Sequence, residues 1–245
     1  MIKKFFTLVL LAITLVSAAQ ETTLLRINYK KGDAYSVKMD MTQNMGTLSS
    51  MSMTMLADIA VTDVKEDVYS SETRFTKMTM DMLTGGNLMS FDSDKSDDEL
   101  DDTGKMMKAQ MGPMLKMIVF TKGNSLGEIL ELKIEPDFPG ATGMVNQSSS
   151  ITYPKEAVKA GSTWNVTKED KGMKMDFTYT VTSISKDNVL LAVSGKISGM
   201  AEGTILGSAT IDRVSGLALK TTIDMTMSIA GQEMTSTIAV VMAKK

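Results

Sequence analysis

Apolar and polar residues alternate along most of the chain, and methionine occupies many of the apolar positions. Residues 50–56 read SMSMTML, in which every second residue from Met51 to Met55 is methionine. Shorter stretches of this kind begin at Met39, Met78, Met173 and Met225. Successive side chains of a strand point to opposite faces, so this period predicts antiparallel strands with one buried and one solvent-facing side.

The middle of the chain follows a different pattern. Residues 91–102 read FDSDKSDDELDD, which predicts an exposed acidic loop. Residues 105–117 then carry apolar side chains at helical spacing, with Gly112-Pro113 as an interruption. Strands are expected at 117–121 and 129–134, followed by a Pro- and Gly-rich loop or short helix between residues 136 and 143. The sequence therefore predicts an all-β fold, in which long antiparallel strands form a curved sheet, half-barrel or sandwich with a short helical insert.

The two halves of the chain share a short motif. GDAYSVK begins at Gly32 and GSTWNVT begins at Gly161, and each leads into an alternating strand. We expect a single β-rich domain over residues 20–245, built from half-units at about 20–121 and 150–245 that a hairpin and loop segment joins. The alternative is that both motifs are ordinary strand starts, with a glycine turn and an aromatic core residue. Trp164 is expected to be such a core anchor.

The first nineteen residues have the order of a secretory signal peptide. Lys3 and Lys4 precede an apolar run from Phe5 to Val16, and small residues follow it before Gln20. The run is too short to predict a membrane span, and no cysteine follows it that could carry a lipid. We therefore expect a signal peptide at residues 1–19 and a mature protein that is periplasmic or secreted and does not span the membrane.

Composition excludes several kinds of chemistry. The chain has no cysteine and no histidine, which removes disulfides, thiolate metal sites, cysteine nucleophiles and Ser-His-Asp triads. The net charge of −3 argues against a nucleic-acid partner. The acidic stretch does not fit an EF-hand, because the sixth and twelfth positions counted from Asp92 are Asp97 and Thr103 instead of Gly and Glu. We expect a non-enzymatic protein with no cofactor and no dedicated metal site.

The segment YPKEAVKAGSTWNV, from Tyr153 to Val166, resembles a strand start in a family of uncharacterised secreted β-rich bacterial proteins. That resemblance implies a fold, and no activity comes with it. In architecture, an exported domain of long antiparallel strands with a helical insert also resembles the periplasmic lipoprotein-carrier half-barrels. In that group a curved sheet holds acyl chains under helices, and no functional residue is carried over from it.

The methionine faces allow three interpretations. Methionine fills irregular gaps, so the faces could be a solid core in a structural or envelope-associated interaction protein. Alternatively, flexible thioethers could line a cavity for an apolar small molecule or lipid, covered by the helical insert. The candidate cavity residues are Met39, Met41, Met51, Met53, Met55, Met78, Met80, Met82, Met173, Met175, Met225 and Met227. The candidate lid residues are Met107, Met111, Met114 and Leu115. The third and weakest interpretation is Cu(I) binding by thioethers of neighbouring strands.

Overall fold

The computed structural model describes residues 21–46, 49–136, 151–170, 172–229 and 231–245. The expected signal peptide and most of the loop expected between residues 136 and 143 lie outside these ranges. The strands are β1 (Thr22–Thr23), β2 (Ala34–Met45), β3 (Ser49–Lys65), β4 (Val68–Thr84), β5 (Asn87–Asp92), β6 (Ile118–Asn124), β7 (Ile129–Glu135), β8 (Val158–Lys159), β9 (Thr163–Asp170), β10 (Met173–Ile184), β11 (Asn188–Gly199), β12 (Glu202–Asp212), β13 (Ala218–Ile229) and β14 (Gln232–Lys244). The helices are the 3₁₀-helix η1 (Asp97–Glu99) and the α-helix α2 (Asp102–Leu115).

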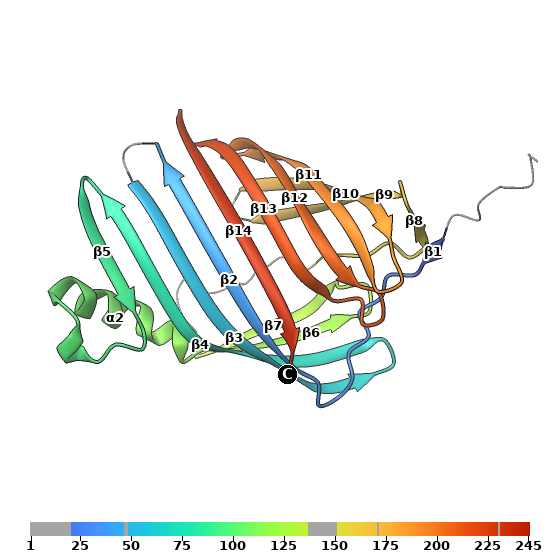
Figure 1. The fold of residues 1–245 in the computed structure, drawn as a ribbon, viewed down its shortest axis with the longest axis horizontal. Helices are drawn as coiled ribbons and strands as arrows, with labels where there is room; N and C mark the ends of the chain where they lie inside the picture. Colours follow the sequence, from blue (N-terminus) through green and yellow to red (C-terminus); the bar gives the residue numbers. More distant parts are fainter. Residues whose placement is uncertain (1–20, 47–48, 137–150, 171, 230) are drawn as a thin grey trace, which may run out of the picture.

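Within the described residues, one antiparallel sheet of twelve strands makes up most of the molecule (Figure 1). Its order is β7-β6-β4-β3-β2-β14-β13-β12-β11-β10-β9, with β5 paired to β4. Two meanders therefore meet where the C-terminal strand β14 pairs with the first long strand β2. Strands β1 and β8 pair separately. The predicted all-β class with a curved antiparallel sheet and a helical insert is confirmed.

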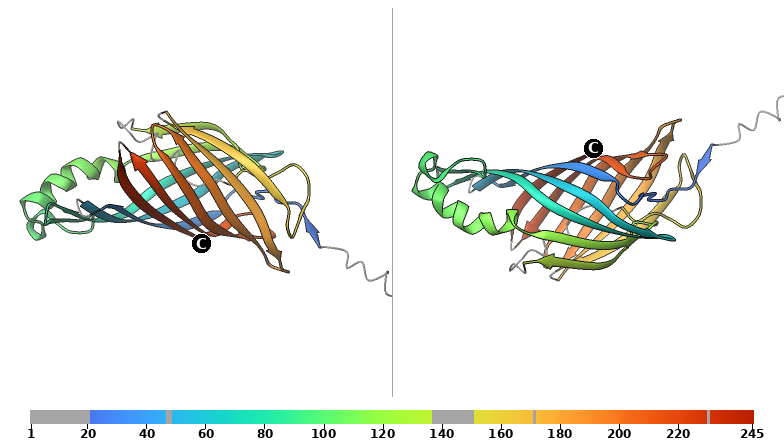
Figure 2. Two further views of the ribbon diagram at one scale, coloured as in Figure 1. Left: turned by 90° about the horizontal axis from the view of Figure 1, so that it is seen from above. Right: turned by 90° about the horizontal axis from the view of Figure 1, so that it is seen from below.

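The sheet curls without closing, as the views from above and below show (Figure 2). Glycines on the concave side of β11 and β12 permit part of this bending. A Cβ atom on Gly207 would lie 2.3 Å from the carbonyl oxygen of Thr222 on β13, and one on Gly195 would lie 2.5 Å from that of Asp176 on β10. Since no larger residue fits these positions without displacing the next strand, glycine allows the strands to approach on their inner side.

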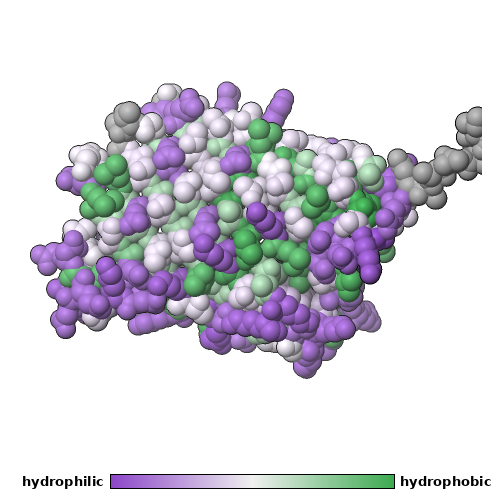
Figure 3. All heavy atoms as spheres, viewed as in Figure 1, coloured by the Kyte–Doolittle hydropathy of each residue, from purple (hydrophilic) through white to green (hydrophobic). Residues whose placement is uncertain are grey.

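The convex side is the solvent-facing side of the alternating pattern. In Figure 3 its apolar residues form separate patches among polar and intermediate ones. Leu206 and Val241 are examples of exposed apolar side chains on these strands. Scattered apolar residues of this kind are normal on a protein surface. The core is therefore on the concave side.

The two largest core clusters on the concave side differ in composition. The cluster of the C-terminal half is built from Val, Leu, Ile, Ala and Tyr, whereas that of the N-terminal half is built almost entirely from Met. Trp164 stacks on Tyr179 with ring centroids 5.4 Å apart and donates its indole N–H to the Thr152 carbonyl at 2.8 Å. The expectation that Trp164 anchors the core is confirmed.

Three predictions for the middle of the chain need correction. The acidic stretch is not one exposed loop, because Phe91 and Asp92 end strand β5 and the Phe91 side chain is buried. Helix α2 starts earlier than expected, because the Asp101 carboxylate caps it by accepting the Gly104 N–H at 2.7 Å. It also continues through Gly112-Pro113. A proline this near the helix end removes only one of the last hydrogen bonds.

The motifs at Gly32 and Gly161 adopt the same local geometry. The Gly32 N–H donates to the Val61 carbonyl at 2.9 Å, and the Gly161 N–H donates to the Val181 carbonyl at 2.8 Å. Each valine N–H donates back to the residue after the glycine, at 2.8 and 2.9 Å. The threonine after each valine then donates its hydroxyl to a carbonyl across the hairpin, at 3.2 and 3.1 Å. The two motifs thus occupy equivalent places in the two meanders, while the division into half-units stays a prediction.

Candidate functional site

The concave side of the sheet borders an apolar cavity of about 340 Å³. This volume lies within the roughly 300–1,000 Å³ range of ligand pockets. Residues of β6 and β7 line it together with residues of β13 and β14, which are not neighbours in the sheet, so the cavity lies inside the curl. The lining residues are Ile27, Tyr29, Val37, Met39, Met41, Met53, Met55, Ala57, Ile59, Tyr69, Ser71, Thr73, Phe75, Met114, Met117, Val119, Thr121, Ile129, Leu132, Ile151, Tyr153, Gly216, Leu217, Ala218, Thr221, Ile238, Val240 and Met242.

Strand register brings the methionines of the N-terminal half together. Two rows cross β2, β3 and β4, namely Met39–Met55–Met78 and Met41–Met53–Met80. Side chains directly opposite one another lie on the same face, with Cβ atoms about 4.5–5.5 Å apart. The rows run from the cavity, at Met39 and Met41, to a fully packed region, where Met78 is completely buried.

Four of the predicted cavity residues line the cavity: Met39, Met41, Met53 and Met55. Met78 and Met80 are buried beside it in the cluster around Phe91, and Met51 packs against that cluster. Met82 faces Met51 and Met89 near the end of β4 and is not a lining residue.

The predicted cavity residues of the C-terminal half lie elsewhere. Met173, Met175, Met225 and Met227 belong to a separate cluster around Ile205 and do not line the cavity. On β13, Thr221 is the lining residue nearest to Met225, which lies four residues further along the strand. At about 3.4 Å per residue, this places Met225 roughly 13–14 Å away from the lining position. Parity alone assigned these residues to the correct face, but not to the correct end of the strands.

Helix α2 lies beside β5 and β4 (Figure 1) and contributes Met107 and Met114 to the methionine cluster of the N-terminal half. Of the predicted lid residues, only Met114 lines the cavity. Met107 is buried in the cluster, and Met111 and Leu115 are partly buried against it. The helix therefore forms part of the cavity wall.

The inward side of β4 changes in character along its length. Tyr69, Ser71, Thr73 and Phe75 line the cavity in this order, and Met78 and Met80 follow after the strand changes parity. An irregularity in the pairing of β3 with β4 causes the change. Polar hydroxyls thus occupy one end of the cavity wall, and apolar carbon and sulfur atoms occupy the other.

Sequence reasoning did not identify this hydroxyl-bearing end. Besides the β4 residues it includes Tyr29 and Tyr153, which come from chain segments outside the long strands, and Thr121, which pairs with Ser71. Thr221 also lines the cavity, but it lies in register with Met39 and Met55 at the methionine end. The period-2 pattern from Tyr69 to Phe75 was a usable signal, because these four residues share one parity. No strand pattern marked Tyr29 or Tyr153.

The cavity lining within the described residues contains no Asp, Glu, Lys or Arg. Burial raises the pKa of the Tyr29, Tyr69 and Tyr153 hydroxyls above the ordinary tyrosine value, which keeps them protonated. The Tyr153 hydroxyl donates to the Gly216 carbonyl at 2.7 Å. The site therefore presents neutral hydroxyl groups and no fixed charge.

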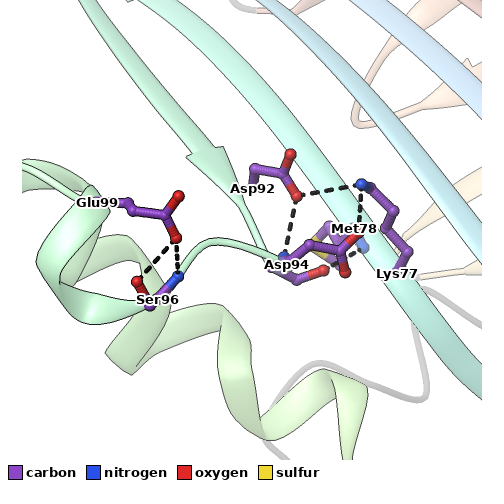
Figure 4. Close-up of polar contacts among 7 residues, drawn as sticks. Lys77, Met78, Asp92, Asp94, Ser96 and Glu99 are labelled. Atoms are coloured by element: carbon purple, nitrogen blue, oxygen red, sulfur yellow. Dashed lines mark hydrogen bonds and ion pairs between the residues drawn. The ribbon is translucent and has the colours of Figure 1, made fainter.

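The acidic stretch is held by lysines. The Lys77 ammonium lies 3.4 Å from the Asp92 carboxylate and 2.5 Å from that of Asp94 (Figure 4). Lys108 on α2 contacts Asp97 at 2.7 Å. The described residues contain no group of three or more His, Cys, Asp or Glu placed to hold a metal ion. These carboxylates fix the loop that leads into α2.

Comparison with known proteins gives one family match over part of the chain and two solved structures that align with it. Residues 142–240 match a family of unknown function, DUF6263. No curated protein sequence matches this chain. The sheet is similar to that of lipovitellin, in a structure described by its lipid–protein interactions, with a TM-score of 0.57 and 10% identity over 89% of this chain. The chain spans 26% of the lipovitellin chain.

A second solved structure, Rv2717c from M. tuberculosis, aligns over 88% of this chain and 92% of its own at 11% identity. Its TM-score of 0.29 is too low to indicate a shared fold. The resemblance to an uncharacterised β-rich family with a loose half-barrel likeness is confirmed by the family match and by the fold of lipovitellin. Among the described residues, no helix has the length and the apolar composition needed to cross a membrane.

Proposed function

We propose that this protein is an exported, non-enzymatic binding protein that holds an apolar, lipid-like molecule in the cavity between β2–β7 and β13–β14. The observation that carries the proposal is the cavity itself, about 340 Å³ in volume, with aliphatic, aromatic and methionine side chains over most of its wall. Burying apolar surface contributes about 25 cal/mol per Å², so an acyl chain gains most of its binding free energy from such a wall.

Two further observations support a lipid as the ligand class. The methionines lining the cavity have flexible side chains, which adapt to apolar guests of different shape. The curved sheet shares its fold with lipovitellin, a protein described by its lipid–protein interactions. Export rests on the N-terminal sequence, with its basic start, apolar run and small residues.

The alternative, a structural or envelope-associated protein with a solid methionine core, fits the cluster beneath α2 but not the neighbouring cavity. A Cu(I)-binding function draws some support from the methionine rows. Met78, however, is completely buried and packed in a cluster with Phe91 and Met107, so its sulfur is not open to an ion. The rows serve packing at one end and the cavity at the other.

The test is native mass spectrometry of the purified protein, followed by organic extraction and analysis of bound lipids. The matched pair of variants is Ala57→Leu and Ala192→Leu. Ala57 lines the cavity, so a larger side chain there occupies ligand volume, whereas Ala192 is exposed on the convex side. We expect bound lipid in the wild type and in Ala192→Leu, and less in Ala57→Leu. A protein that is empty after purification and takes up no added lipid contradicts the proposal.

A further inference from the structure

We propose that the ligand is a neutral, single-chain lipid with a hydroxyl or ester head group, bound with the head beside Tyr29, Tyr69 and Ser71 and the tail toward Met53 and Met55. This inference rests on the proposed function and specifies its substrate class. It follows from three features of the cavity, which are its missing charges, its free hydroxyls and its position beside a second, polar cavity.

The first feature is that none of the described lining residues carries a charged side chain. An ionised carboxylate or phosphate that enters such a wall loses its hydration and gains no cation in return. A hydroxyl or ester group loses far less, and the loss is offset by each hydrogen bond it makes. The wall therefore selects a neutral head group.

The second feature is a set of hydroxyls that face the cavity and are not engaged elsewhere. Ser71 and Thr221 line the cavity and are only 7% and 4% exposed. Among the described residues, every fully buried side-chain oxygen or nitrogen atom has a hydrogen-bond partner. Since the structure shows no side-chain hydrogen bond for Ser71, its hydroxyl must reach the open volume, where a ligand oxygen can pair with it.

The polar end and the apolar end are far enough apart to orient a chain. Phe75 follows Tyr69 by six positions on β4, a distance of about 20 Å along an extended strand. Beyond Phe75 the wall continues into the methionine rows. The volume of about 340 Å³ is near the lower limit of ligand pockets, which favours one acyl chain over two.

The third feature is the adjoining cavity of about 370 Å³, which shares Ile27, Tyr29 and Tyr69 with the apolar one. It contains Arg26 and Arg213, so an anionic head group could in principle extend into it.

Both arginines are already engaged. The Arg26 guanidinium donates to the Pro154 carbonyl at 2.8 Å and to the Lys155 carbonyl at 2.5 Å. Arg213 is paired with Glu21 and donates to the Ser185 carbonyl at 2.9 Å. Because Glu66 and Asp67 also line this cavity, an anion there would meet carboxylates and no uncommitted arginine. The second cavity therefore does not favour an anionic head.

The experiment compares four probes with the same alkyl chain, namely a fatty alcohol, its 1-monoacylglycerol, the fatty acid and the unsubstituted alkane. Each is titrated into the delipidated protein, by displacement of a fluorescent apolar dye, at a pH well above the carboxyl pKa. We expect the alcohol and the monoacylglycerol to bind at least about tenfold more tightly than the ionised acid. The acid should bind more tightly as the pH falls and its carboxyl group becomes neutral.

Variants then locate the head group. Ser71→Ala and Tyr69→Phe each remove one hydroxyl with little change in volume, and we expect each to weaken alcohol binding by about threefold to tenfold and to leave alkane binding unchanged. Tyr179→Phe is the matched control, because Tyr179 is buried in the core and does not line the cavity. A carboxylate that binds as tightly as the alcohol, or an alkane that does so, overturns the inference while the proposed function stands. Failure of all four probes to bind overturns both.

Discussion

The truncation of two methionines in the same cross-strand row tests whether the cavity is open. Met39 and Met78 both face Met55, one from β2 and the other from β4. Met78 is 0% exposed and belongs to the packed cluster beneath α2, whereas Met39 is only partly buried and borders the cavity. The two substitutions Met39→Ala and Met78→Ala therefore remove the same atoms from a half-open and from a closed environment.

The expected losses of stability differ accordingly. A fully buried methionine truncated to alanine costs about 2–5 kcal/mol, as the sum of lost burial and the void left behind. Met39 already faces open volume, so its truncation leaves little new void and removes only part of the side chain's burial. We expect a loss of about 1 kcal/mol for Met39→Ala, from the partial transfer contribution alone.

The assay is urea unfolding of the delipidated variants, followed by far-ultraviolet circular dichroism. The midpoint should fall clearly for Met78→Ala and slightly for Met39→Ala, with similar slopes. If Met39→Ala lowers the free energy of unfolding as much as Met78→Ala does, the row is packed solid at both ends, and the cavity on which the proposed function rests is not present in solution.

Three further predictions concern the glycines, alkaline stability and copper. Gly207→Ala places a Cβ atom 2.3 Å from the Thr222 carbonyl oxygen and should lower the free energy of unfolding by about 1–3 kcal/mol. Gly112→Ala has open space around it in α2 and should raise that free energy by roughly 0.5–1 kcal/mol. Thermal melts distinguish the two variants, and equal shifts would contradict the stated role of glycine in sheet curvature. Burial raises the pKa of Tyr179 from 10.0 to about 12, so its contribution to folding stability is complete below pH 10.0, and up to about 3 kcal/mol of it is lost as the pH rises toward 12. Tyr179→Phe should flatten the fall in the free energy of unfolding over this range, and an unchanged alkaline profile would refute that assignment. Titration with Cu(I) in competition with a chelator should show no stoichiometric uptake, and one equivalent taken up per chain would restore the copper interpretation.

Within each regularly alternating run, local sequence pattern predicted the face on which the residues lie. The alternation of Met53 and Met55 with Ser52 and Thr54 determines which side chains are sheltered, because the strand period does not depend on the rest of the fold. For this reason the all-β class and the antiparallel sheet were predictable, and the helical insert was predictable from its different apolar spacing. The absence of cysteine and histidine likewise excludes their chemistry on composition alone.

Local pattern was less reliable where an interaction came from another segment. Strand β5 was missed because the short run from Asn87 to Asp92 is stabilised by other segments, through its pairing with β4 and the burial of Phe91 in the methionine cluster. The change of parity in β4 depends on an irregular pairing with β3, which the sequence of β4 does not show. The start of α2 depended on a cap at Asp101, inside a stretch that resembled a loop.

Within the regularly alternating runs, the sequence by itself determined which residues are sheltered, since side-chain direction follows from the backbone period of a strand. Only the tertiary structure decided which sheltered residues surround open volume, because curvature and register set how far apart the two sides of the sheet stand. Met39 therefore faces a cavity while Met78, in the same row, is packed solid, and Met225 lies in a different cluster. Tyr29 and Tyr153 line the same cavity from segments outside the long strands, where no strand period applies.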